Sequence, residues 1–167
     1  MNERTFLDTN VLIYADDQDA GEKASVCREI LRTAISSGRG VLSTQVLQEF
    51  FVVSTRKLGV PPDVARRKVE LLCTLEVIGI QVADVLAAID LHRLHSISFW
   101  DALIVRSAAA AGCKRLLTED LQDGSVISGV RIESPFRALG PTSAGARRPL
   151  RLRAGGSNPA RAHSSRC

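Results

Sequence analysis

The chain has 167 residues, 45% of them hydrophobic and 24% charged, a composition typical of one globular domain with a substantial core. No apolar run reaches the roughly 18–20 residues that cross a bilayer, and no signal-like segment follows Met1. The four cysteines lie at least 40 residues apart without C-x-x-C spacing, which disfavours a zinc site and indicates reduced thiols. We therefore expect a cytoplasmic protein that does not enter the membrane.

The net charge of +4 is distributed unevenly along the chain. Residues 1–140 contain 16 Lys and Arg against 18 Asp and Glu, a balance of −2, whereas residues 141–167 contain six Arg and no acid. This last stretch is rich in Gly, Pro, Ala and Ser, which predicts a disordered tail after a folded domain over 1–140. Two interpretations of the tail stay open, an arm that attracts RNA and an incidental extension.

Strands and helices are predicted to alternate along the folded part. The clearest helix covers residues 22–37, where apolar residues recur on one side until Gly38 ends the pattern. Strands separated by helices indicate right-handed crossovers and a mainly parallel sheet covered on both faces, which is an α/β fold. The expected strands cover 5–7, 41–43, 76–82, 115–118 and 130–132. The other expected helices cover 11–14, 44–58 with Thr44 as its cap, a segment beginning at 61–63, 84–95 and 100–112.

Asp101 lies where a charge is unexpected. It opens a helix in the apolar stretch 98–105 and shares a face with Ile104 and Val105 at helical spacing. A buried carboxylate without a partner protonates rather than stay charged, so a cation, a metal ion or helix-end donors must compensate it. Ser98 precedes it by three residues, so a capping box is the simpler alternative explanation.

Three other acids occupy comparable places. Asp8 closes the first strand, and Asp120 follows the strand 115–118 by two residues, at the edge where α/β sheets bind ligands. Glu49 lies on a helix among apolar neighbours. Each alone has a simpler explanation, namely capping, a buried ion pair with arginine, or a loop position. Four such coincidences in one small domain instead indicate a common site.

A cluster of carboxylates repels itself and raises its own pKa values unless positive charge is present. Mg²⁺ or Mn²⁺ supplies that charge through oxygen ligands and binds substrate phosphates as well. The acids therefore point to a metal-dependent reaction on a phosphate ester. The sequence contains no Ser-His-Asp order and no glycine-rich phosphate loop, which disfavours acyl transfer and nucleoside-triphosphate chemistry.

Four motifs carry a family resemblance over residues 4–136. They are Phe6-Leu7-Asp8-Thr9-Asn10-Val11-Leu12, Ser43-Thr44-Gln45-Val46-Leu47-Gln48-Glu49-Phe50, Ser98-Phe99-Trp100-Asp101-Ala102-Leu103-Ile104 and Leu116-Leu117-Thr118-Glu119-Asp120-Leu121. In this order and spacing the chain resembles PIN-domain ribonucleases, specifically VapC-type toxins of type II toxin–antitoxin pairs. The resemblance implies a three-layer α/β/α sandwich with a central, mainly parallel sheet.

The resemblance also implies roles for individual residues. The metal-binding and catalytic carboxylates of the family correspond to Asp8, Glu49, Asp101 and Asp120. Small polar residues near the metal and the scissile phosphate correspond to Thr9, Asn10 and Thr118. The motif favours Asp120 over the adjacent Glu119 as the ligand, and Asp123 is a weaker outer candidate.

The function that the resemblance implies is Mg²⁺-dependent endoribonuclease activity, with Mn²⁺ as a possible substitute. Such an enzyme hydrolyses RNA phosphodiester bonds, forms a homodimer and is neutralised by a cognate antitoxin protein. The residues alone leave two alternatives open. One is a catalytically silent PIN-like RNA-binding module, and the other is a metal-dependent phosphatase or nuclease acting on DNA.

Substrate contacts are less clear in the sequence. Trp100 and Phe99 can stack on a base, but packing in the core beside Leu103 is the preferred interpretation. The acids near residues 16–19 lack the ligand spacing of a calcium loop and are expected to be solvated. Candidate phosphate contacts, which can equally form a solvated face, are Arg56, Lys57, Arg66, Arg67, Lys68 and Arg106.

Overall fold

A six-stranded sheet in the order β3-β2-β1-β4-β6-β5 forms the centre of the computed structural model, which describes residues 3–139. All neighbouring strands run parallel except β5, which pairs antiparallel with β6. The predicted parallel sheet is confirmed, and β5 is an addition to it. The strands are β1 (Thr5–Leu7), β2 (Gly40–Ser43), β3 (Glu76–Ile78), β4 (Arg115–Leu117), β5 (Val126–Ile127) and β6 (Val130–Glu133).

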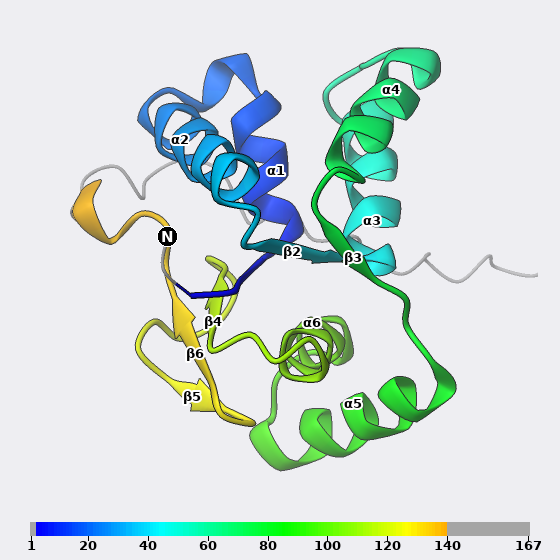
Figure 1. Cartoon of the computed structure of the whole chain (residues 1–167), viewed down its shortest axis with the longest axis vertical. Helices are drawn as coiled ribbons and strands as arrows, with labels where there is room; N and C mark the ends of the chain where they lie inside the picture. Colours follow the sequence, from blue (N-terminus) through cyan, green and yellow to red (C-terminus); the bar gives the residue numbers. More distant parts are fainter. Residues whose placement is uncertain (1–2, 140–167) are drawn as a thin grey trace, which may run out of the picture.

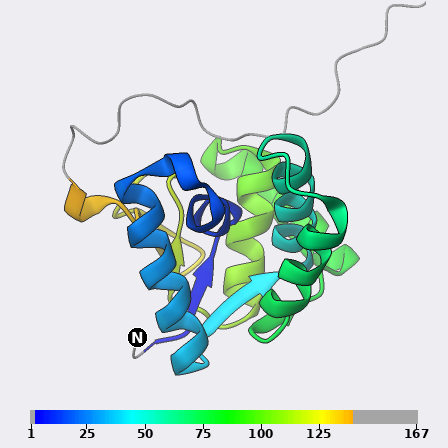
Figure 2. The ribbon, with the colours of Figure 1, turned by 90° about the horizontal axis from the view of Figure 1, so that it is seen from above.

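Helices cover both faces of this sheet. Figure 1 shows α1 to α4 on one side and α5 with α6 on the other, which is the expected three-layer α/β/α arrangement. Seen from above, α1 starts at the tip of β1 (Figure 2). The helices are α1 (Thr9–Asp16), α2 (Glu22–Ser37), α3 (Thr44–Arg56), α4 (Pro62–Leu72), α5 (Val82–His95) and α6 (Phe99–Ala110), with short 3₁₀ turns at Gln18–Ala20 and Arg137–Leu139.

Most predicted boundaries agree with the structure, and the differences have local causes. The helix predicted over 22–37 is α2, which ends because Gly38 adopts the left-handed conformation with φ of 62°. The cap of α3 is Ser43 and not Thr44, because the Ser43 hydroxyl accepts the Val46 N–H at 3.4 Å. The strand expected over 76–82 stops at Ile78, and α5 already begins at Val82.

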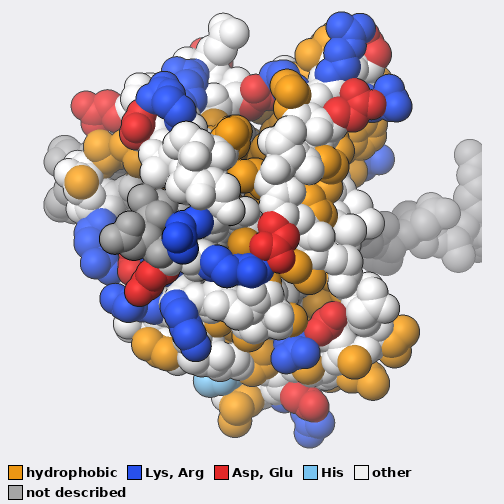
Figure 3. Space-filling model, viewed as in Figure 1, with side chains coloured by type: hydrophobic (Ala, Val, Ile, Leu, Met, Phe, Trp, Pro, Cys, Tyr) orange, Lys and Arg blue, Asp and Glu red, His pale blue; other side chains and the backbone are white. Residues whose placement is uncertain are grey.

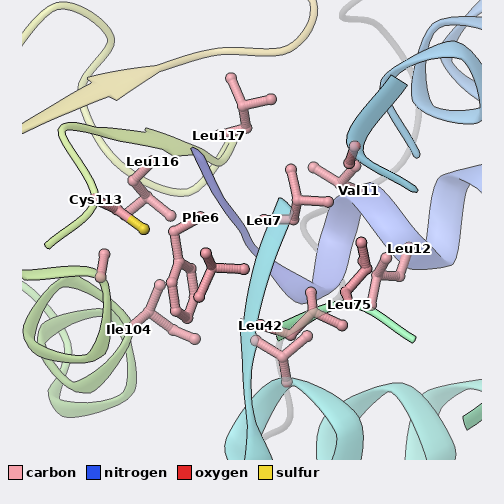
Figure 4. Packing of buried hydrophobic residues seen from close by; sticks show 14 of the residues in the cluster. Phe6, Leu7, Val11, Leu12, Leu42, Leu75, Ile104, Cys113, Leu116 and Leu117 are labelled. Carbon is pink, nitrogen blue, oxygen red and sulfur yellow. The ribbon is translucent and has the colours of Figure 1, made fainter. Parts of the chain in front are cut away.

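The core consists of apolar side chains that leave β1 toward opposite layers. Phe6 points toward Ile104 of α6, whereas Leu7 points toward Val11 and Leu12 of α1 (Figure 4). Phe6 and Leu7 are completely buried. Each such side chain contributes roughly 1.5–3 kcal/mol when it leaves water. This packing on both faces fixes the end of β1, where Asp8 follows.

Two further expectations concerned a membrane-spanning segment and a disordered tail. Within residues 3–139 no helix combines the length and the apolar character needed to span a bilayer. The boundary at residue 140 and the tail over 141–167 lie outside the described residues.

Candidate active site

A pocket opens at the carboxyl ends of the central strands. Parallel pairing of β1 with β4 brings residue 8 next to residues 118–120, although more than a hundred positions separate them in the chain. All four predicted acids line this pocket. Its lining residues are Asp8, Thr9, Asn10, Ile13, Gln45, Glu49, Val53, Ser98, Trp100, Asp101, Ile104 and Asp120.

Asp8 is the buried centre of the site, with 7% of its surface exposed. It caps α1, because its Oδ1 accepts the Thr9 N–H at 2.7 Å. Its Oδ2 accepts two further hydrogen bonds, from Thr118 Oγ1 at 2.6 Å and from Asn10 Nδ2 at 3.1 Å. The side chain is therefore held in one orientation from three directions.

The pKa of Asp8 is raised to about 7, mainly by burial and to a smaller extent by the negative charges of Asp120 and Glu49. The hydrogen bonds from Thr118 and the Thr9 N–H act in the opposite direction but are outweighed. At neutral pH the protonated and the charged form of Asp8 are therefore both populated. A positive charge in the pocket would lower the pKa and favour the charged form.

Glu49 approaches the pocket from α3 and is held by two donors. Thr9 Oγ1 donates to its Oε2 at 2.9 Å, and Gln45 Nε2 donates to its Oε1 at 2.9 Å. Within residues 3–139 neither of these donors to Glu49 is an arginine. One turn of helix separates Gln45 from Glu49, which is why both face the pocket.

Asp101 takes part in the cap of α6 and also lines the pocket. Its N–H donates to Ser98 Oγ at 3.1 Å, which is the predicted cap of α6. The Ser98 hydroxyl in turn lies 2.6 Å from Asp101 Oδ2, to which it donates. The carboxylate also lines the pocket, and it is partly and not fully buried because the first turn of α6 lies at the edge of the sheet.

Asp120 completes the acid cluster from the loop after β4. Its N–H donates to Thr118 Oγ1 at 3.1 Å, and its Oδ2 accepts Asn10 Nδ2 at 3.4 Å. Thr118 is buried and does not line the pocket. Its hydroxyl group contacts Asp8 and the Asp120 N–H and is not exposed in the pocket. Thr9 and Asn10 do line the pocket.

The neighbouring acids lie elsewhere. Glu119 turns away from the pocket and accepts the Tyr14 hydroxyl at 2.5 Å and Lys23 Nζ at 2.7 Å. Asp123 is exposed, pairs with Arg137 at 2.7 Å and does not line the pocket. The motif-based preference for Asp120 over Glu119 agrees with this geometry.

Gln45 and Trp100 are among the pocket residues that were not assigned to the site from the sequence. Gln45 is buried, and its Nε2 also donates to the Trp100 carbonyl at 3.2 Å. Its position four residues before Glu49 was a usable sign, because that spacing places both on one helix face. The preferred core position of Trp100 is wrong, since 50% of its surface is exposed and it lines the pocket. Phe99 does pack inward, against Ala88 and its neighbours.

Of the three acids within residues 16–19, Asp16 and Asp17 are less solvated than expected, whereas Asp19 is exposed. Asp16 binds Lys68 Nζ at 2.5 and 2.6 Å, and Asp17 is buried as the cap of a 3₁₀ turn. Lys68, a candidate phosphate contact, is therefore engaged in an ion pair. Arg66, Arg67 and Arg106 likewise pair with Glu70, Asp63 and Asp84. Arg56 and Lys57 are exposed and form no ion pair with any described residue.

The donor chemistry of the pocket suits a hard divalent cation, because it offers four carboxylates and no sulfur or imidazole. Asn10 Oδ1 is buried without a hydrogen-bond partner among the described residues, and its Nδ2 is committed to carboxylates, so the amide cannot turn around. Within residues 3–139 no three His, Cys, Asp or Glu side chains are already arranged around one metal position. The carboxylates are instead turned toward Ser98, Thr9 and Gln45.

A family model, the PIN domain, matches residues 5–122, most of the chain and all four acids. The chain belongs to the PIN-domain family. The first motif and the last of the four lie at the two ends of the matched region, so the match covers the site from Asp8 to Asp120. No curated protein matches the chain.

Several solved structures share this PIN fold. A toxin–antitoxin complex from Klebsiella pneumoniae is 19% identical, with 78% of this chain and 97% of that chain covered and a TM-score of 0.61. VapC20 from Mycobacterium tuberculosis, a toxin that cleaves the sarcin–ricin loop, is 17% identical, with 67% and 86% covered and a TM-score of 0.58. DNA-bound VapBC from Salmonella typhimurium is 22% identical, with 80% and 98% covered and a TM-score of 0.59.

Proposed function

We propose that this PIN domain is a metal-dependent endoribonuclease that hydrolyses phosphodiester bonds in RNA. The observation that carries the proposal is the convergence of Asp8, Glu49, Asp101 and Asp120 on one pocket from four separate parts of the fold. A fold gains nothing in stability from collecting like charges, so such a cluster favours a functional explanation.

Mg²⁺, with Mn²⁺ as a substitute, is the proposed cofactor, held by these four carboxylates. The bound ion would polarise the scissile phosphate and supply an activated water. The raised pKa of Asp8 and the unpartnered Asn10 Oδ1 support a cation in this pocket.

The surrounding residues act by orienting the acids. Thr118 and the Thr9 N–H hold the two oxygens of Asp8. Thr9 Oγ1 and Gln45 hold Glu49 from opposite oxygens. Because these donors are themselves buried and packed, the carboxylates are positioned before substrate arrives, which lowers the cost of assembling the site.

The biological role that fits best is the toxin of a toxin–antitoxin pair. Solved structures with this fold include toxin–antitoxin complexes, and the match covers 97% and 98% of the matched chains in two of them. An apolar groove between α2 and α4 suits the apolar face of an antitoxin helix, and Figure 3 shows hydrophobic side chains in the notch between these two parts. Ile35 and Leu71 lie on this groove and are 50% and 69% exposed.

A homodimer is the second proposed assembly. Val82, Leu86 and Ile89 are exposed on α5 at helical spacing and form an apolar stripe. Sedimentation of the purified protein, compared with a Leu86→Glu variant, tests the dimer. A wild-type monomer at micromolar concentration would contradict this part of the proposal.

The central experiment incubates the purified full-length protein with RNA and with single-stranded DNA, in Mg²⁺, Mn²⁺ or EDTA. We expect RNA cleavage that needs the divalent ion and that disappears in Asp8→Asn. The matched control is Asp123→Asn, which changes an acid of the same region outside the pocket.

The outcomes separate the alternatives. Cleavage that persists in EDTA or in Asp8→Asn contradicts the metal nuclease. Cleavage of DNA alone favours the DNA-directed nuclease, and RNA binding without any cleavage favours the silent module. Failure of a co-expressed short upstream reading frame to suppress cleavage contradicts the antitoxin but leaves the nuclease.

A further inference from the structure

Trp100 has an environment that its residue type does not explain. It is the only tryptophan of the chain, and half of its surface is exposed. A tryptophan gains more from burial than most side chains, so an exposed indole that does not serve the core requires another explanation. Its neighbours supply one, because it lines the pocket together with Asp8, Asp101 and Asp120.

The Trp100 backbone is tied to the acid cluster. Its carbonyl accepts Gln45 Nε2 at 3.2 Å, and the same amide nitrogen donates to Glu49 at 2.9 Å. Because the Glu49 carboxylate and the Trp100 carbonyl can only accept, the Gln45 amide must turn its nitrogen toward both of them. Trp100 is thus held at a defined place relative to a carboxylate of the site.

The Trp100 ring is also supported from behind. Phe99 meets it edge to face, with ring centroids 5.3 Å apart and planes inclined by 67°. Phe99 in turn packs against the small cluster of Ala88, Ala102 and Leu103 between α5 and α6. The indole therefore stands on a packed base, which limits its motion and reduces the entropy that binding would cost.

From these contacts we propose that Trp100 is a base-stacking residue, which binds an unpaired nucleobase beside the phosphate held over the acids. This rests on the proposed nuclease function and adds a specificity-determining residue to it. Stacking on an aromatic ring suits any base, because every base has a π-face, and it requires that the base be unpaired. It follows that a paired, fully stacked duplex is a poor substrate for this site.

The single tryptophan makes the test direct, because intrinsic fluorescence reports this position alone. Full-length Asp8→Asn protein with Mg²⁺ is titrated with a single-stranded 12-nucleotide RNA and with an abasic RNA of the same length. The two oligomers carry the same phosphates, so electrostatic binding is common to both. We expect quenching by the first and little quenching by the second.

Variants of the active protein give the kinetic counterpart. Trp100→Leu should raise KM for single-stranded RNA by about 5- to 100-fold, the range expected for one lost stacking contact, with a smaller change in kcat. Trp100→Phe should restore most of the loss. The control Phe51→Leu, an exposed aromatic on α3 outside the pocket, should leave KM unchanged.

The possible results distinguish this inference from the proposed function. Equal quenching by the two oligomers, or an unchanged KM in Trp100→Leu, overturns the stacking role even if RNA is cleaved. A Trp100→Leu protein that dissociates from dimer to monomer also overturns it, because the indole then belongs to the interface. Base-dependent quenching in a wild-type protein that cleaves nothing supports stacking and rejects the nuclease.

Discussion

Two adjacent acids, Glu119 and Asp120, belong to regions with opposite electrostatics. Glu119 lies in a structural cluster with Lys23, Tyr14 and Phe136, whereas Asp120 lies in the acid pocket. In the cluster Lys23 Nζ is 2.7 Å from Glu119 and lies over the rings of Tyr14 and Phe136, at 4.7 and 4.5 Å from their centroids. The partly buried carboxylate of Glu119 therefore has a cation beside it.

The acid pocket differs in this respect. Its lining, among the described residues, contains four carboxylates and no Lys or Arg. Hydrogen bonds from Thr118, Thr9, Gln45 and Ser98 orient the acids but add no charge. In the cluster a lysine lies beside the acid, whereas the described lining of the pocket holds its acids with neutral donors. Under the proposed function, the pocket is the region adapted to an external ligand.

The largest effect is expected from Asp101→Asn. It should reduce RNA cleavage by about 1000-fold or more while the melting temperature stays equal or rises, because the change removes repulsion among carboxylates. Initial cleavage rates and circular dichroism melts measure the two quantities. The matched change in the structural cluster, Glu119→Gln, should leave RNA cleavage unchanged and lower the melting temperature. A folded, active Asp101→Asn protein would reduce this acid to a capping residue.

The next effect concerns the pH dependence of stability without metal. The raised pKa of Asp8 means that the folded chain binds this proton more tightly than the unfolded chain. The resulting stabilisation, on the order of a few kcal/mol, is complete below pH 4 and is lost as the pH rises through about 7. Urea unfolding in EDTA from pH 4 to 8 measures it. Asp8→Asn should remove this part of the slope, and parallel curves for the two proteins would contradict it.

A smaller loss is expected when the structural cluster loses its cation. Lys23→Met leaves Glu119 with 17% of its side chain exposed and without its ion pair, which should lower the free energy of unfolding by about 3 kcal/mol. The double variant Lys23→Met with Glu119→Gln should recover much of that loss, because no buried charge remains. Urea unfolding measures all three proteins. Equal instability of single and double variants would show that packing, not charge, governs the cluster.

The smallest effect is expected at an exposed acid. Asp123 pairs with Arg137 at 2.7 Å, where both side chains are largely in solvent. Asp123→Asn should therefore leave cleavage unchanged and alter stability only within the range of surface ion pairs. Cleavage assays and thermal melts check this. A large loss of activity would place Asp123 in the site and would contradict the assignment of the site to the pocket acids alone.

Much of the fold follows from patterns that are local in the sequence. The helix over 22–37 was predictable to the residue because its periodicity ends at Gly38, which then adopts a positive φ. The strand β5 was missed because Val126–Ile127 is a two-residue segment, too short for any alternation. It exists because β6 offers it an edge to pair with, which is a tertiary cause.

The site was predictable to a similar extent. The acids were identified because charges in apolar surroundings are rare, and that rarity is visible in the sequence. Trp100 was assigned to the core because it precedes Leu103 in an apolar stretch, and most residues that follow it in α6 are buried. Only the position of the first turn at the sheet edge exposes it, and no local pattern encodes that position. The same holds for Lys23 and Glu119, which meet across 96 positions.

The hydrogen bond between Asp8 and Thr118 joins the first strand to one made much later in synthesis. A ribosome that has translated the chain only as far as residue 114 has produced β1 and α1 but none of β4. Asp8 then lacks Thr118 and Asp120, and β1 lacks its central neighbour. Under the proposed function, a nascent chain that lacks β4 therefore has an incomplete site and cannot cleave the RNA of its own ribosome. Under the same proposal, activity requires that β4 and the loop carrying Asp120 have joined β1.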